Sequence, residues 1–466
     1  MAENQSLGSH AVVIGGSIGG LLAGRVLSDY FEKVTIVERD EIGDSAGPRK
    51  GVPQGNHVHT IYGGGASVIE RMLPGLFEQM VSEGATECDF SKGLVWYHQG
   101  VWKMRTETGL TSFWQSRPFL ESHIRRRVRD IANVKIIERC DAESLLANED
   151  RSKVTGIRVT HRNDEDRSEE LTADLVIDAS GRGSKAPAWL EELGYQKPAE
   201  TTVGIDLAYA SRIYERPDDS TRDWTVMGLF PTPPHNKRVG YIFPIEGQRW
   251  VVSAVGYLGD HPPDDEEGFL KFAESLELPD FYEAIKDAKP LTPVTKFRYP
   301  AQIRRRYESL SRLPDGLVVL GDGVCSFNPV YGQGMSACAL QVAVLQEVLK
   351  SHAATGQLMG LPSDFFRRAA KLIDNPWLLA TNSDFLYPET TGHRPFGTAF
   401  LNWYVVRVFE MCACNNRALQ TFLEVLHFIK KPTALFHPAL VFSVLKWSLG
   451  LKGGYRRTTA RPMITD

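Results

Sequence analysis

The sequence predicts an α/β fold with a Rossmann-like domain, an inserted and mostly antiparallel β-sheet domain, and a C-terminal helical region. Residues 10–40 read as strand, glycine turn, helix and strand, which is typical of the first part. Residues 203–256 hold four strand-like runs with no helix between them, and residues beyond 361 are helical with Pro and Gly breaks. A chain of 466 residues is long enough for two or three such domains.

The bulk composition excludes several function classes. The chain carries 53 Lys and Arg against 57 Asp and Glu, and its arginine runs are short, so we expect no nucleic-acid partner. Six scattered cysteines without zinc-ligand spacing and a polar N-terminal stretch predict free thiols in the cytoplasm. No apolar run reaches about 20 residues, so no spanning helix is expected. The apolar residues 434–451 predict a buried helical hairpin, with peripheral membrane contact as the alternative.

The glycine turn at 15–20 is the strongest motif. Gly15 permits a tight turn after a buried strand, and Gly20 lets the following helix pack closely on that strand. The helix N-terminus suits a pyrophosphate, and Glu38 at the end of the next strand suits an adenosine ribose. Ser17 replaces the middle glycine of the usual pattern. The unit therefore predicts dinucleotide binding without separating NAD from FAD.

Apolar periodicity and the positions of Gly and Pro predict the elements of the rest of the chain. The predicted elements are a shaped loop at 48–59, a helix at 65–83, a hairpin at 94–97 and 101–102, a helix at 116–128, strands at 134–137, 154–159 and 175–178, antiparallel strands at 203–213, 224–231, 238–244 and 249–256, a helix at about 267–275, a strand at 317–320, and a long helix ending near 349.

Several residues in these elements have both a functional and an ordinary interpretation. His57 and His59 point to one side of an extended loop, but no third ligand stands nearby, so no metal site is expected. Arg117 is either a surface arginine or a binding residue. The acid and the glycine-rich turn at 178–184 are equally compatible with a ligand site and with an ordinary turn. The aromatic residues of the antiparallel run form either ordinary core or an apolar substrate wall: Tyr209, Trp224, Phe230, Tyr241, Phe243 and Trp250.

The order of three glycine-rich sites, at 15–20, 178–184 and 321–334, resembles the FAD-dependent monooxygenases of the p-hydroxybenzoate hydroxylase fold over nearly the whole chain. The strings RKGVPQGNHVH at 49–59 and FNPVYGQGM at 327–335 resemble the branch of the polyene epoxidases of polyether biosynthesis, such as those for monensin and lasalocid. The strings at 375–377 and 384–389, and Pro432, also fit that branch. Ser17 and Ser180 depart from the family pattern.

This resemblance implies a domain division and a set of site residues. Residues 1–88, 110–200 and 301–360 would form a discontinuous FAD-binding domain, 89–109 and 201–300 a substrate-binding β domain, and 361–466 a C-terminal helical cap. The residues expected to bind FAD are Gly15, Ser17, Ile18, Gly19, Gly20, Glu38, Arg39, Arg49, Gly51, Val52, Gln54, Arg117, Cys140, Asp178, Gly181, Gly321, Asp322, Gly332, Gln333, Gly334 and Met335. The chemistry is centred on the flavin, and the residues expected to flank its ring are His57, Pro329, Tyr331 and Gln333.

The resemblance also implies an activity. Reduced FAD and O2 would form an electrophilic flavin C4a-hydroperoxide that epoxidises or hydroxylates a hydrophobic polyene, polyketide or isoprenoid-like secondary metabolite. Because only one Rossmann unit is present, NAD(P)H would dock transiently, or a separate flavin reductase would supply the electrons.

Three other activities compete with this one. The first is an isoprenoid reductase or desaturase similar to the geranylgeranyl reductases. The second is a non-catalytic flavin scaffold or lipid carrier. A flavin halogenase is disfavoured because the Trp-x-Trp-x-Ile-Pro string of the indole halogenases is absent.

Overall fold

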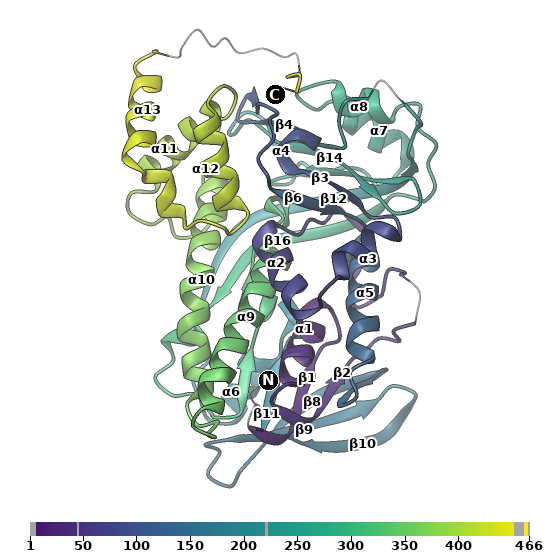
Figure 1. Ribbon diagram of the computed structural model, residues 1–466, viewed down its shortest axis with the longest axis vertical. Coiled ribbons are helices and arrows are strands. Elements are labelled where there is room, and N and C mark those ends of the chain that lie inside the picture. The colour runs from purple at the N-terminus through teal and green to yellow at the C-terminus, as the bar shows by residue number, and fades with distance from the viewer. Residues whose placement is uncertain (1–5, 44–45, 220–221, 452–460, 465–466) are drawn as a thin grey trace.

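The computed structural model describes residues 6–43, 46–219, 222–451 and 461–464. A parallel sheet lies at one end of the elongated molecule, and a large curved sheet and a helical cap lie at the other (Figure 1). The predicted cap also included 452–460 and 465–466, which lie outside the described residues.

The N-terminal sheet has five parallel strands in the order β17-β11-β1-β2-β7. Their bounds are β1 (Gly8–Ile14), β2 (Phe31–Val37), β7 (Val134–Ile137), β11 (Leu175–Asp178) and β17 (Leu317–Val319). The central strands are almost wholly apolar, as expected for a parallel sheet that is buried on both faces. α1 (Ile18–Leu27) connects β1 to β2 and contacts α5 (Arg117–Arg129) and α9 (Gly334–Ala353). The predicted strand–turn–helix–strand unit is confirmed.

A second, three-stranded antiparallel sheet packs beside the first. It consists of β8 (Cys140–Ala147), β9 (Val154–His161) and β10 (Asp164–Thr172). Only β9 was predicted. β8 and β10 lack the apolar alternation that marks a half-buried strand, and pairing with β9 holds them in place.

The large sheet has eight strands in the order β18-β16-β12-β15-β14-β13-β4-β5. Their bounds are β4 (Leu94–His98), β5 (Val101–Trp102), β12 (Glu200–Glu215), β13 (Val226–Leu229), β14 (Arg238–Ile245), β15 (Arg249–Gly256), β16 (Thr295–Arg305) and β18 (Cys325–Ser326). The predicted hairpin and four-strand run are confirmed, although β13 pairs with β4 in parallel. The polar strand β16 was not predicted. A small ribbon of β3 (Thr86–Asp89) and β6 (Thr111–Trp114) lies nearby.

The helices predicted at 116–128 and about 267–275 are confirmed as α5 and α7 (Glu266–Glu274), whereas α4 (Phe90–Gly93), α6 (Ala186–Glu192) and α8 (Asp280–Ile285) were not predicted. The single helix predicted at 65–83 is wrong, because Pro74 and Gly75, with φ of +75°, divide it into α2 (Gly63–Met72) and α3 (Leu76–Ser82). The long helix ending near 349 is confirmed as α9.

The C-terminal region is helical, as predicted. α10 (Leu361–Asp384) runs along α9 and leads to α11 (Thr398–Met411), α12 (Asn416–Leu426), the 3-10 turn η6 (Pro432–Phe436) and α13 (Pro438–Ser448) (Figure 1). The buried helical hairpin predicted at 434–451 is wrong, because Phe442 is 60% exposed and Leu449 is 78% exposed. Within the described part of the chain, no helix has the length and apolarity needed to cross a bilayer.

Candidate functional site

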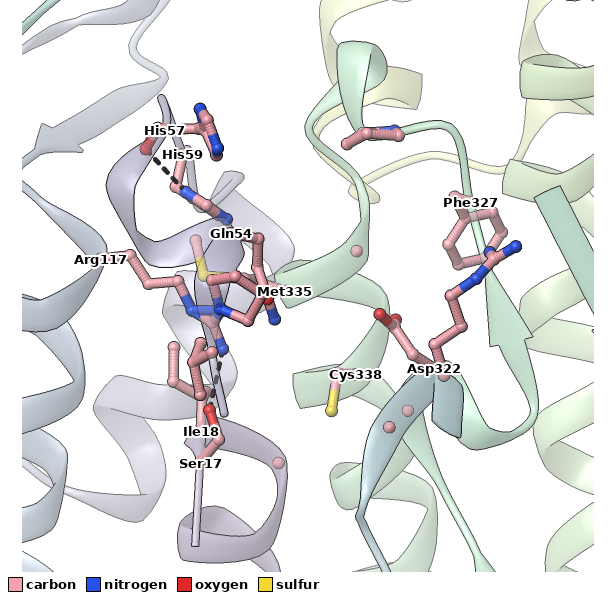
Figure 2. Close-up of a pocket in the computed structure, with 18 of the residues that line it drawn as sticks. Ser17, Ile18, Gln54, His57, His59, Arg117, Asp322, Phe327, Met335 and Cys338 are labelled. Atoms are coloured by element: carbon pink, nitrogen blue, oxygen red, sulfur yellow. Dashed lines mark hydrogen bonds between the residues drawn. The ribbon is translucent and has the colours of Figure 1, made fainter. Parts of the chain in front are cut away.

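A cavity of about 590 Å³ lies between the parallel sheet and the large sheet. Segments that are distant in the sequence meet around it. Figure 2 shows Ser17, Ile18 and Arg117 on one side, with Asp322 and Cys338 facing them across the gap. Its volume is in the range of cofactor and small-molecule sites.

Most of the predicted site residues line this cavity. They are Gly15, Ser17, Ile18, Gly19, Glu38, Arg39, Gly51, Val52, Gln54, His57, Arg117, Cys140, Gly181, Gly321, Asp322, Pro329, Gly332, Gly334 and Met335. The cavity lining does not include the other five, which are Gly20, Arg49, Asp178, Tyr331 and Gln333. What each residue binds stays a prediction.

Close backbone contacts leave no room for a side chain at Gly15 or at Gly20. Gly15 has φ of +101°, and a Cβ there would lie 2.7 Å from the carbonyl oxygen of Ala179. A Cβ on Gly20 would lie 1.7 Å from the Gly15 carbonyl oxygen. Gly20 therefore serves the packing of α1, while the N-terminus of α1 at Ile18 lies at the cavity with its positive dipole end.

Glu38 is held rigidly at the cavity edge. Its carboxylate accepts hydrogen bonds from the backbone N–H of Gly16, at 2.8 Å, and of Asp40, at 2.9 Å. Arg49 approaches the same carboxylate at 3.3 Å from behind, which explains why Arg49 does not line the cavity. The carboxylate is therefore oriented before any ligand arrives.

Glu121 on α5 joins these parts and was missed by sequence reasoning. It is 4% exposed and accepts a 2.6 Å hydrogen bond from Ser17 Oγ. It also forms an ion pair with Arg49 and lies 3.7 Å from Arg117 and 3.8 Å from Arg125. The i, i+4 spacing on both sides of Glu121 was the available signal, but it is equally common on exposed helix faces.

Arg117 and Asp322 place opposite charges on the two walls. Arg117 donates a 2.8 Å hydrogen bond to Ser17 Oγ, and its buried Nε has no hydrogen-bond partner (Figure 2). Burial lowers the pKa of Arg117 and raises that of Asp322, although Arg117 and Arg182 oppose the rise. Arg182, which was also missed, lines the cavity and stacks 4.5 Å above the ring of Tyr299.

The prediction that Asp178 contacts a ligand in this cavity needs correction. One oxygen of its fully buried carboxylate accepts hydrogen bonds from Ser180 N and Oγ, at 2.9 and 2.5 Å. The other oxygen accepts a 2.6 Å bond from Ser184 Oγ. Asp178 therefore holds the 179–183 loop, whose own residues line the cavity.

The part of the cavity next to the large sheet is an aromatic chamber. Its walls carry Tyr62, Phe90, Trp96, Trp114, Tyr209, Phe230, Tyr241, Phe243 and Phe297. Two residues proposed for this wall, Trp224 and Trp250, instead stack on each other at 5.6 Å in a separate core with α7 and α8. The chamber residues Tyr241 and Phe243 pair with Ser253 and Val251 of β15. Because successive side chains of a strand point to opposite faces, Trp250 lies on the face away from the chamber.

His57 lines the chamber and keeps one ring nitrogen without a partner. The ring lies between Tyr209 and Phe297, at centroid distances of 5.5 and 5.6 Å. Nδ1 lies 2.7 Å from Ser211 Oγ, whereas the buried Nε2 has no hydrogen-bond partner. Burial lowers the pKa of His57 to about 4, so the imidazole is neutral at pH 7. Among the described residues, no group of three His, Cys, Asp or Glu is arranged to hold a metal ion.

The turn η5 (Pro329–Tyr331) contributes Pro329 and Val330 to the cavity wall and is bound by two tyrosines of the aromatic chamber. The carbonyl oxygen of Val330 accepts a 2.9 Å hydrogen bond from Tyr241, and that of Tyr331 accepts one of 2.9 Å from Tyr62. Gly332 follows in the left-handed region, with φ of +64°, and α9 begins at Gly334. The positive end of a 20-residue helix therefore lies beside this turn.

A buried carboxylate, Asp384, fixes this turn from behind. It accepts hydrogen bonds from Gln302 Nε2 at 2.6 Å, Asn328 Nδ2 at 2.9 Å and Tyr331 Oη at 2.8 Å. The Tyr331 phenol thus points toward α10, which explains its absence from the cavity wall. Burial raises the pKa of Asp384 to about 7, although the bonds from Tyr331 and Asn328 oppose the rise.

The sequence is similar to that of a known mycobacterial protein over most of its length. No protein-family model matches this chain. Protein Rv3254 of Mycobacterium tuberculosis is 34% identical over 406 residues, which cover 84% of this chain and 84% of that protein.

Solved structures of low sequence identity share the architecture. The flavin-dependent brominase Bmp2 has a TM-score of 0.66 at 14% identity, over 96% of this chain and 100% of that one. A flavoprotein/dehydrogenase from Cytophaga hutchinsonii has a TM-score of 0.67 at 13% identity, over 95% and 100%. The p-nitrophenol 4-monooxygenase PnpA from Pseudomonas putida has 0.63 at 14%, over 91% and 99%. The fold is that of the p-hydroxybenzoate hydroxylase type, as predicted.

Replacing Asp384 with Asn should change how stability depends on pH. The raised pKa means that the folded protein keeps a proton which the unfolded chain releases between about pH 4 and about pH 7. This carboxyl therefore contributes stability that is present below about pH 4 and is lost as the pH rises to about 7. The difference in free energy of unfolding between wild type and Asp384→Asn should shrink over that window in urea titrations. A difference independent of pH, or the same course for the exposed Asp287→Asn, would contradict the assignment.

Proposed function

We propose that this chain, which belongs to the same family as Protein Rv3254 of Mycobacterium tuberculosis, is an FAD-dependent monooxygenase that acts on a hydrophobic substrate. The observation that carries the proposal is one continuous cavity with two chemically different parts. One part offers a glycine turn, a helix N-terminus and a fixed carboxylate, and the other is lined by aromatic rings.

The residues of the first part fit FAD. The glycine turn leaves its backbone open for close approach by a pyrophosphate, and Glu38 is oriented for the hydroxyls of a ribose. The unpartnered Nε of Arg117 supplies a donor to the ribityl or phosphate groups. The N-terminus of α9 would stabilise negative charge on the reduced cofactor.

The chemistry that reduced FAD supplies when bound is activation of O2, with transfer of one oxygen atom to an electron-rich carbon. The chain's aromatic chamber excludes water and holds an alkene or aromatic ring in place. We propose that NAD(P)H is the electron donor, docking transiently or acting through a separate reductase. The resemblance of segments 49–59 and 327–335 favours epoxidation of a polyene, polyketide or isoprenoid-like metabolite, and the free cysteines suit the cytoplasm.

His57 gives the apolar chamber one polar contact. Its neutral ring presents Nε2 without a partner, and a buried polar atom of this kind is stabilised when a ligand binds it. We propose that Nε2 forms a hydrogen bond with an oxygen atom of an otherwise apolar substrate.

The reaction can be tested with purified, FAD-loaded protein, NAD(P)H and a panel of apolar polyenes. We expect consumption of one NAD(P)H and one O2 for each product that is one oxygen atom heavier, with the other oxygen leaving as water. The reaction should incorporate 18O from labelled O2, as read by mass spectrometry. Product formed without O2 would instead support an isoprenoid reductase, and halogenated product in the presence of bromide would support a halogenase.

Replacing Arg117 with Lys should weaken FAD binding. The charge remains, but the planar donor set that reaches the cavity is lost, at a cost of about 1.5–3 kcal/mol, or roughly tenfold or more in Kd. The matched control is Arg125→Lys, because Arg125 also lies beside Glu121 but does not line the cavity. Fluorescence titration of apoprotein with FAD measures both. Equal losses in the two variants would refute a direct contact by Arg117.

Replacing His57 with Phe should preserve the ring between Tyr209 and Phe297 while removing Nε2. We expect unchanged FAD affinity and a fall in kcat/KM of about tenfold for oxygen-bearing substrates. Pairs of substrates that differ by one oxygen atom provide the internal control, because the variant should lose its preference within each pair. An unchanged preference would show that Nε2 does not contact the substrate.

A further inference from the structure

The surface of the C-terminal cap carries exposed apolar side chains, which we call the cap patch. Its members are Phe396, Phe400, Phe436, Phe442, Leu445 and Leu449, with exposures from 42% for Phe436 to 108% for Phe396. They come from the loop before α11, from α11 itself, and from η6, α13 and the residue after α13, at one corner of the molecule (Figure 1). Rings of α11 and η6 contact each other, since Tyr404 stacks on Phe436 at 4.8 Å.

α13 shows that this exposure is not a by-product of core packing. Leu440, Val444 and Trp447 face the core of the cap. Phe442, Leu445 and Leu449, at i, i+3 and i+7, form a second apolar face that is 51–78% exposed. A helix that is apolar on both faces usually has a partner on each of them.

The charge of this region identifies the chemistry of the partner. Residues 392–466 contain ten Lys and Arg against three Asp and Glu, whereas the other 391 residues contain 43 against 54. Lys431 and Lys446 are exposed, and Lys446 Nζ lies 4.6 Å from the centroid of the Phe442 ring, whereas the exposed Lys430 forms a 2.6 Å ion pair with Glu424. Aromatic and aliphatic side chains bordered by lysines, on an otherwise acidic protein, match an anionic lipid surface.

The inner side of the same cap closes the aromatic chamber. Phe422 on α12 lies 5.6 Å from Trp96, and His427 lies 5.0 Å from Tyr62 and 4.6 Å from Phe90, measured between ring centroids. Tyr62, Phe90 and Trp96 all line the cavity. Phe422 and His427 therefore connect the cap to the walls of the aromatic chamber.

We propose that the cap patch docks this protein on the surface of an anionic phospholipid membrane. The apolar side chains enter the interface, and the lysines pair with the headgroups. Docking there brings the chamber close to apolar molecules dissolved in the lipid. The docking itself does not rest on the oxygenase assignment, because it depends on the cap alone.

Vesicle co-sedimentation of the full-length, FAD-loaded protein tests the proposal. We expect binding to vesicles of phosphatidylcholine with phosphatidylglycerol, weaker binding to phosphatidylcholine alone, and a decrease with added salt. The triple variant Phe442→Ser, Leu445→Ser, Leu449→Ser should bind about tenfold less tightly or worse, because it removes the exposed apolar face of α13. The matched control is Leu291→Ser with Met359→Ser, which replaces exposed apolar side chains outside the cap and should bind like wild type.

Three results would overturn the proposal. The first is a wild type that does not bind anionic vesicles, and the second is a patch variant that binds as tightly as the control. The third is a wild-type dimer in light scattering that the triple variant converts to a monomer, since the patch would then face a second copy of the chain. An unchanged thermal unfolding midpoint and FAD content in the variants would show that the lost binding is not a loss of folding.

Discussion

The site depends on one buried carboxylate, that of Glu121. Without water around it, this charge is stable only if it is paired, and three arginines and a serine hydroxyl meet that need. The partners belong to the first glycine turn, to the loop at 48–59 and to α5 itself. Their common attachment fixes three segments that are separated in sequence, so the polar part of the cavity exists before any ligand enters it.

The cavity joins a polar environment and an aromatic one. Two helix N-termini, Arg117 and Arg182 favour an anionic ligand in one part, while Asp322 and Glu38 offer acceptors for hydroxyl groups. The other part is aromatic and has few polar atoms, of which Nε2 of His57 is one without a partner. The turn at Pro329–Tyr331 contributes Pro329 and Val330 to the wall of the same cavity.

Local signals in the sequence predicted much of this arrangement. The five parallel strands are short apolar runs, and the turn at Gly15 requires a backbone conformation that favours glycine, so both are readable without tertiary information. The strands β8, β10 and β16 were not predicted, because pairing and not an apolar pattern stabilises them. Asp178 ends a buried strand as expected, yet which way its carboxylate points is decided by the serines that follow it.

Other features could not be read from the sequence, because they depend on register and on tertiary pairing. Tyr241 lies opposite Ser253 in the β14–β15 pair, on the face of the sheet that is turned toward the chamber. Trp250 lies on the opposite face of the sheet. Glu121 resembles any acid in a charged helix until Ser17 and Arg49 are placed beside it. The exposed face of α13 was likewise hidden, since an apolar stretch does not reveal which of its sides remains uncovered.

Asp384 has a mechanical consequence. It is the last residue of α10, yet its carboxylate is fastened to β16 through Gln302 and to the turn before α9 through Asn328 and Tyr331. Asp384 therefore ties the end of α10 to β16 and to the turn that precedes α9, and a shift of α10 along its own axis would break all three hydrogen bonds at once.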